Sequence, residues 1–207
     1  MKVEVAESLI FSWLKHIKGC KITQLNWKSS DNWELFNETE VLDYVVKAEN
    51  RFPNILKKSK PVQFLSQAEI DVLGIEIKNN ENYYYAIDVA FHENGLCYGS
   101  IDVCVDKVTQ KMIRSAMILF HHFNTKKGEI IFASPKISPK LDKIMKERFQ
   151  EISEFMRGLG FGFNFTLLSN NSFNEEIISK ILAESSKIKD TSELFIRAFQ
   201  LHNLCIK

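Results

Sequence analysis

Long apolar runs are missing from this 207-residue sequence, and so are the usual sorting signals. Uninterrupted apolar runs such as AMILF at 116–120 are far too short to span a bilayer. The first ten residues, MKVEVAESLI, carry two glutamates where a secretory signal peptide needs a basic start and an apolar run. We therefore expect a cytoplasmic protein with no membrane span.

A large net charge of either sign is also missing. The sequence has 27 Lys and Arg against 26 Asp and Glu, which gives a formal net charge of +1. A strongly basic nucleic-acid-binding module would usually carry a larger positive excess, because duplex binding depends largely on the neutralisation of phosphates. Charge alone therefore leaves nucleic acid as a possible partner and does not single it out.

Closely spaced cysteine pairs are absent as well. None of the four cysteines forms a C-x-x-C motif, which would be typical of a metal site or a redox centre. We expect free, buried thiols in a reducing compartment. These cysteines are Cys20, Cys97, Cys104 and Cys205.

The chain does have enough apolar and aromatic residues, 45% and 12% of the total, to fill a core. Its length and the lack of repeats favour a single domain over residues 1–207. The periodicity of apolar residues predicts the element order α-β-α-β-β-α-β-α-β-α-α. The predicted helices are 3–18, 37–50, 102–123, 138–160, 173–187 and 190–204, and the predicted strands are 20–27, 68–77, 83–92, 128–134 and 161–168.

This order predicts an α/β fold with a mixed central sheet flanked by helices. We expect 69–77 and 83–92 to form an antiparallel hairpin, because the intervening KNNEN has the residues of a tight turn. The helix over 104–123 should pack on this hairpin, and prolines 53 and 61 should break regular structure between 51 and 61. The residues expected to face the sheet are Val108, Met112, Ala116, Leu119 and Phe120.

The strand YYYAIDVAFH raises the question of function. One face carries large apolar or aromatic side chains, whereas the other carries Asp88 between two alanines, followed by His92. On the preceding strand, Glu69 and Asp71 lie two residues apart and hence on one face. Across a hairpin Asp71 and Asp88 could approach each other, and two adjacent carboxylates repel unless a proton or a cation intervenes. The pattern therefore predicts a site for Mg²⁺, or for Mn²⁺ in its place.

A helix with a glutamate, a strand with an aspartate and a strand with an acid resembles the PD-(D/E)xK nuclease superfamily, the restriction-endonuclease-like fold. Its core order αβββαβ is similar to residues 1–135, which leaves 136–207 as a C-terminal α/β extension. The resemblance implies that Glu7, Asp71 and Asp88 bind the metal, with Glu69 as an extra acid beside Asp71.

The sequence departs from this pattern at Ala90, where the family has its lysine. Some members of the family recruit a basic residue from the following helix. Here Lys107, Lys111 and Arg114 share one stripe of that helix, and Lys111 lies nearest the packed border. Lys111 is therefore the first candidate for the missing lysine and His92 the second. If the protein is an active nuclease, we expect Lys111→Ala to reduce Mg²⁺-dependent cleavage by orders of magnitude while leaving folding intact.

Other interpretations remain open for each of these residues. Asp88 could be a hydrogen-bonded structural carboxylate, Glu7 lies only at the border of an apolar stripe, and the basic stripe could be a solvated face. His121 and His122 lie at the end of the long helix, where a positive charge is favoured by the helix dipole. We therefore expect them to cap the helix and not to bind a metal. The functional hypotheses are a metal-dependent nuclease, an inactive member of the fold that binds nucleic acid or protein, and an unrelated protein with an acidic ligand pocket.

Overall fold

The computed structural model describes residues 4–30, 32–57, 59–96, 98–189 and 191–205, and it shows a five-stranded mixed sheet in the order β1-β2-β3-β4-β5. The first three strands are antiparallel, whereas β4 and β5 run parallel to β3. The strands are β1 (Ile22–Lys28), β2 (Glu69–Lys78), β3 (Glu81–Val89), β4 (Lys127–Ser134) and β5 (Gly162–Ser169). The predicted mixed α/β architecture and the β2–β3 hairpin are thus confirmed.

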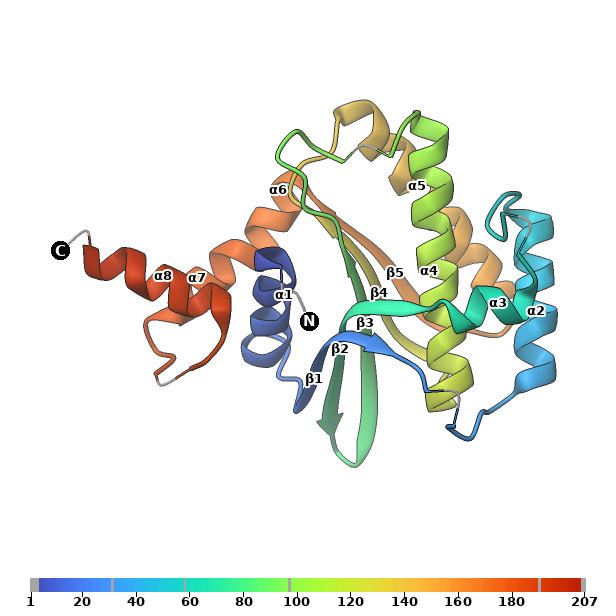
Figure 1. The fold of residues 1–207 in the computed structure, drawn as a ribbon, viewed down its shortest axis with the longest axis horizontal. Coiled ribbons are helices and arrows are strands. Elements are labelled where there is room, and N and C mark those ends of the chain that lie inside the picture. The colour runs from blue at the N-terminus through green and yellow to red at the C-terminus, as the bar shows by residue number, and fades with distance from the viewer. Residues whose placement is uncertain (1–3, 31, 58, 97, 190, 206–207) are drawn as a thin grey trace.

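Helices cover both faces of the sheet (Figure 1). On one face lie α2 (Glu38–Arg51), α3 (Pro61–Ser66), α4 (Ile101–Phe123) and α5 (Pro139–Gly158). On the other lie α1 (Val5–His16), α6 (Asn170–Phe173), a π-helical turn (Asn174–Ile178), α7 (Ser179–Ser185) and α8 (Leu194–Cys205). In the part of the chain that is described, no helix is both long and apolar enough to cross a membrane.

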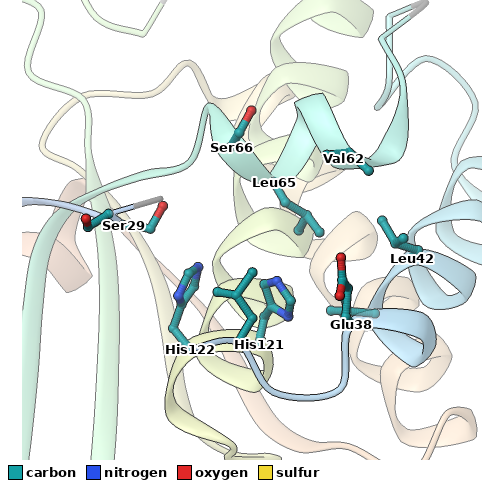
Figure 2. Close-up of a pocket in the computed structure, with 11 residues that line it drawn as sticks. Ser29, Glu38, Leu42, Val62, Leu65, Ser66, His121 and His122 are labelled. Carbon is teal, nitrogen blue, oxygen red and sulfur yellow. The ribbon is translucent and has the colours of Figure 1, made fainter. Parts of the chain in front are cut away.

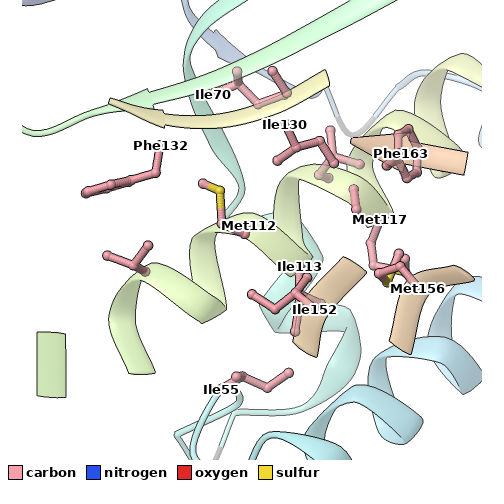
Figure 3. Packing of buried hydrophobic residues seen from close by; sticks show 14 of the residues in the cluster. Ile55, Ile70, Met112, Ile113, Met117, Ile130, Phe132, Ile152, Met156 and Phe163 are labelled. Carbon is pink, nitrogen blue, oxygen red and sulfur yellow. The ribbon is translucent and has the colours of Figure 1, made fainter. Parts of the chain in front are cut away.

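The larger apolar core lies between the sheet and α4. All five residues expected to face the sheet are buried there, namely Val108, Met112, Ala116, Leu119 and Phe120. Figure 3 shows Met112 on the sheet side of α4 with Ile70 and Phe132, while Ile113 lies beside Ile152 of α5. This packing fixes the position of α4 over β3, and with it the polar side chains that α4 presents to the edge of the core.

On the opposite face α1 packs closely against β2. A Cβ atom built on Gly74 of β2 would lie 2.9 Å from both Leu14 Cδ1 and Cys20 Sγ, so a larger side chain would push α1 away. Leu14 and Cys20 belong to the second buried cluster, together with Ile87 of β3. The close approach of α1 brings its first turn to the sheet edge where β2 begins.

Three details of the predicted elements are wrong. Strand β3 ends at Val89, so Phe91 and His92 lie beyond it in the following loop, and both are exposed. Pro61 does not simply break the chain but begins α3, because proline is well suited to the first turn of a helix. The predicted helix 173–187 is interrupted by the π-helical turn Asn174–Ile178.

The expectation for the cysteines holds only in part. Cys20 and Cys104 are free and buried, and burial is the main cause that raises the pKa of Cys20 to about 12, which keeps this thiol unreactive. Cys205 is free but exposed, because it lies at the end of the solvent-facing part of α8. Cys97 lies outside the described residues.

Candidate functional site

Asp71 and Asp88 lie on neighbouring strands at the same level of the sheet. The last β2–β3 pair in this direction is Val72↔Ile87, so one further step along each strand reaches the two aspartates. The neighbours of Asp88 on its face, Ala86 and Ala90, belong to the core under α4. The alternation of β3 therefore directs Asp88 toward α4, where its side chain is only 1% exposed.

Lys111 of α4 reaches both aspartates. Its Nζ lies 2.7 Å from Oδ1 of Asp88 and 3.9 Å from Oδ2 of Asp71. One helical turn further on, the hydroxyl of Ser115 donates to Oδ2 of Asp88 over 3.3 Å. The backbone N–H of Val89 donates to Oδ2 of Asp71 over 2.8 Å. The structure thus assembles two carboxylates and one ammonium from three separate elements.

The electrostatics of this group are strained. Burial, followed by the charge of Asp88, raises the pKa of Asp71 to about 6, although Lys111 and the Val89 N–H act in the opposite direction. Burial also opposes the charged form of Lys111, but Asp88 and Asp71 outweigh it and raise the pKa of this lysine. Two carboxylates therefore share one ammonium, and the site has more negative charge than its own cation offsets.

Arg114 is a further basic group near the aspartates that the sequence interpretation left on the solvated stripe. Its guanidinium lies 4.6 Å from the ring centre of Phe64, and its Nη1 donates to the carbonyl of Gln67 over 3.4 Å. Its Nε is buried and has no hydrogen-bond partner among the described residues. Burial lowers the pKa of Arg114, and the charge of Asp88 partly offsets that effect. The sequence pattern that could have indicated a role for Arg114 is its spacing of three residues from Lys111, which places both side chains on one face of α4.

Tyr98 is the second neighbour that the sequence did not single out. Burial is the main cause that raises the pKa of its phenol, and the phenol also senses Lys111, Asp88 and Asp71. The ring of Tyr98 lies 4.6 Å from Nζ of Lys107. Its approach depends on the path of the loop after β3, which alternation along a strand cannot predict.

The remaining candidates lie outside this group. Glu69 is exposed and forms an ion pair with Lys28 of β1 over 3.2 Å. His92 does not share a strand face with Asp88, because β3 has already ended, and its ring instead lies 5.9 Å from that of Tyr98. The structure therefore brings Lys111, and not His92, to the carboxylates.

Glu7 of α1 lies near the site without joining it. Its charge contributes to the raised pKa of Asp71, as the smallest of the causes. Its Oε2 accepts from Nδ2 of Asn26 over 3.4 Å. Asn26 has a left-handed backbone conformation, φ 50°, at the point of β1 that would pair with Asp71, so the ladder is locally distorted there.

The aspartates offer carboxylate oxygens, which are the ligands that a hard metal ion prefers. Within the described part of the chain, no group of three or more His, Cys, Asp or Glu side chains could hold such an ion, so Glu7 does not complete a three-carboxylate set. Mg²⁺, however, takes one or two carboxylates and completes its shell with water. In this structure the cation that contacts both Asp71 and Asp88 is the ammonium of Lys111.

One expectation about Lys111 is also revised. Its side chain is 35% exposed and neutralises two largely buried carboxylates, so it is not an exposed lysine of little consequence for folding. Its removal should destabilise the protein, because it would leave buried charge without a partner.

Comparison with known protein families, with curated proteins and with solved structures found no match to this chain.

Proposed function

We propose that this protein is a metal-dependent phosphodiesterase acting on nucleic acid, with a restriction-endonuclease-like core in which Lys111 replaces the lysine of the PD-(D/E)xK motif. The observation that carries the proposal is the contact of one ammonium with both motif aspartates, at 2.7 Å and 3.9 Å. This ammonium belongs to Lys111, on the helix that follows the strand with Asp88, and it supplies the basic group that the motif requires.

The packing around Ala90 gives a physical reason for the displaced lysine. Ala90 is 4% exposed and belongs to the core covered by α4. A lysine at this position would have to turn its ammonium into an apolar cluster, at a high desolvation cost. A lysine on α4 instead approaches Asp88 from the rim of the core, where its side chain remains partly solvated.

The chain's own groups would divide the chemistry between them. Asp71 and Asp88 would hold Mg²⁺ or Mn²⁺, which when bound supplies activation of water and stabilisation of phosphate charge. Lys111 would favour the ionised form of Asp71 and offer a positive charge to a phosphate oxygen. The guanidinium of Arg114 also senses the charge of Asp88 and would add positive charge near the same phosphate group.

Cleavage assays test this proposal directly. Single- and double-stranded DNA and RNA are incubated with the protein and with Mg²⁺ or Mn²⁺. Asp88→Asn keeps the size and the acceptor oxygen of the side chain but removes its charge, and we expect it to lose about 10²-fold or more of the activity. Lys111→Ala should show a loss of similar order. Lys47→Ala is the matched control, since Lys47 is an exposed helical lysine whose ion pair with Asp43 lies within α2 itself.

Because Lys111→Ala should also weaken the fold, its activity is compared at a temperature where circular dichroism shows both proteins folded. Full activity in folded Asp88→Asn would contradict the assignment of the site. Absence of cleavage by the wild type with every divalent metal would contradict catalysis.

The second candidate function is a non-catalytic module of the same fold that binds nucleic acid or protein. It is supported by the 1% exposure of the Asp88 side chain, whose two oxygens already contact Lys111 and Ser115. In that case Lys111 is a permanent replacement for the metal, and the pair is a structural ion pair. The two functions therefore differ in whether Mg²⁺ binds at all.

A further inference from the structure

A second cavity lies away from the aspartates, at the far end of α4 (Figure 2). Its volume is about 180 Å³, the space of roughly six water molecules in the liquid, which suits one small planar ring system. Leu42 of α2 and Val62 and Leu65 of α3 form apolar walls. His121 and Glu38 provide polar groups, and Figure 2 shows both projecting into the same space below Val62 and Leu65.

His121 offers a hydrogen-bond acceptor to this cavity. The residue is 5% exposed, and its Nδ1 lies 2.6 Å from the carbonyl oxygen of Phe36. A carbonyl oxygen can only accept, so Nδ1 carries the hydrogen, and in the neutral ring Nε2 then presents a lone pair. This nitrogen has no partner among the described residues. The Phe36 contact thus fixes the ring so that its acceptor serves the cavity.

Glu38 adds a second acceptor to the cavity, and no positively charged side chain there offsets its negative charge. Its carboxylate forms no ion pair or hydrogen bond with the described residues, and no Lys or Arg is among the residues that line the cavity. Anionic ligands such as phosphate groups are therefore repelled. The cavity suits a ligand that brings hydrogen-bond donors to an acceptor pair and a flat apolar body to the aliphatic walls.

Aromatic rings surround one side of the cavity. The ring of His122 lies 5.5 Å from that of Trp27 and 6.1 Å from that of Trp33. Burial, followed by the charge of His121, lowers the pKa of His122 to about 4, so this ring is neutral and does not act as the cationic helix cap that the sequence had indicated. Trp33 and Phe36 are 48% and 41% exposed beside the cavity, and such rings are surfaces on which bases stack.

We propose that this cavity binds a single nucleobase that carries an exocyclic amino group. The amino hydrogens of guanine, adenine or cytosine can donate to Glu38 and to Nε2 of His121, as carboxylates accept from cytosine in base readout. Uracil has no amino group and cannot donate to both acceptors at once, which leaves the nitrogen of the buried His121 or the carboxylate of Glu38 without a donor from the base. This inference does not depend on phosphodiester cleavage, because it involves neither aspartate.

Nuclear magnetic resonance provides a direct test with built-in controls. The indole N–H signals of Trp27 and Trp33 report on the cavity, whereas Trp13 lies on the other face of the sheet, with its Nε1 bonded to the carbonyl of Glu176. Guanosine, adenosine, cytidine and uridine are titrated separately into the full chain. We expect at least one amino-bearing nucleoside to shift the Trp27 and Trp33 signals at concentrations about tenfold lower than uridine needs, with Trp13 unmoved.

Two variants connect binding to the acceptors. Glu38→Gln should weaken binding about tenfold, whereas Glu40→Gln, an exposed glutamate in the same helical turn that does not line the cavity, should leave it unchanged. Shifts by no nucleoside, equal shifts by uridine, or unchanged binding in Glu38→Gln would each overturn the proposal. A short single strand that binds more tightly than its nucleoside would identify a nucleic acid strand as the source of the bound base. Equal binding of the two would identify a free nucleoside as the source.

Discussion

Two carboxylates of this protein, the buried Glu193 and the partly buried Asp71, both lie near a lysine, yet their pKa values are shifted in opposite directions. The Glu193 side chain, which is 4% exposed, accepts from Lys15 over 2.8 Å and contacts His16 at 2.9 Å. Burial opposes its ionised form, but these hydrogen bonds outweigh burial and lower the pKa of Glu193 to about 2. Burial, followed by the charge of Asp88 beside it, raises the pKa of Asp71 to about 6.

The comparison separates a structural carboxylate from a candidate functional one. Glu193, just before α8, connects the start of this helix to the end of α1. Its single carboxylate contacts two basic groups, Lys15 and His16. Asp71 and Asp88 share Lys111, so part of their mutual repulsion remains in the folded state. Retained repulsion of this kind is typical of sites that bind a cation or transfer a proton. Four variants test the comparison, in order of decreasing effect.

Lys111→Ala should have the largest effect on stability. Lys111 is the only ion-pair partner of Asp88 among the described residues. Its loss leaves the buried Asp88 beside the partly buried Asp71, so we expect a loss of about 3 kcal/mol in the free energy of unfolding at neutral pH. Urea denaturation measures the loss. The double variant Asp71→Asn/Lys111→Ala should recover a large part of it, and the absence of any recovery would show that repulsion between the aspartates is not the cause.

Glu193→Gln should lower the free energy of unfolding by almost as much, about 3 kcal/mol at neutral pH. The folded-state pKa is depressed, so the stabilisation is present above the unfolded value of 4.5 and is lost as the pH falls from there toward about 2. Denaturation curves of both proteins at several pH values should therefore converge in acid. A constant difference across this range would contradict the proposed role of the charge.

Asp71→Asn should stabilise the protein, by about 2 kcal/mol above about pH 7. The folded-state pKa is raised, so the wild type carries no penalty below the unfolded value of 3.8 and the full penalty above about 6. The gain should consequently vanish near pH 4. Melting temperatures at both pH values measure it, and a destabilised variant at neutral pH would refute the account of strain at this site.

Glu69→Gln should have the smallest effect. Its ion pair with Lys28 is exposed on both sides, and exposed pairs contribute between zero and about 1 kcal/mol. We expect the melting temperature to change little and any cleavage activity to remain. A large loss of activity would show that Glu69 belongs to the site after all.

The sequence predicted the parts of this site that depend on regular periodicity. Alternation along β2 and β3 placed Asp71 and Asp88 on one face, and helical spacing placed Lys111 at the border of the packed side of α4. It could not place Tyr98, whose approach depends on the loop after β3. It placed Arg114 on the stripe of Lys111 but could not predict the contact of Arg114 with Phe64, because the path of α3 has no period. It also could not predict that β3 ends before His92.

The most direct test of the central claim is calorimetric titration of the protein with Mg²⁺ and Mn²⁺. The account predicts that the wild type binds one ion and that Asp88→Asn does not, while Glu193→Gln, which changes the matched carboxylate of the comparison, binds as the wild type does. Absence of metal binding by the wild type, or equal binding by Asp88→Asn, would contradict the account and leave Lys111 as a structural partner of the two aspartates.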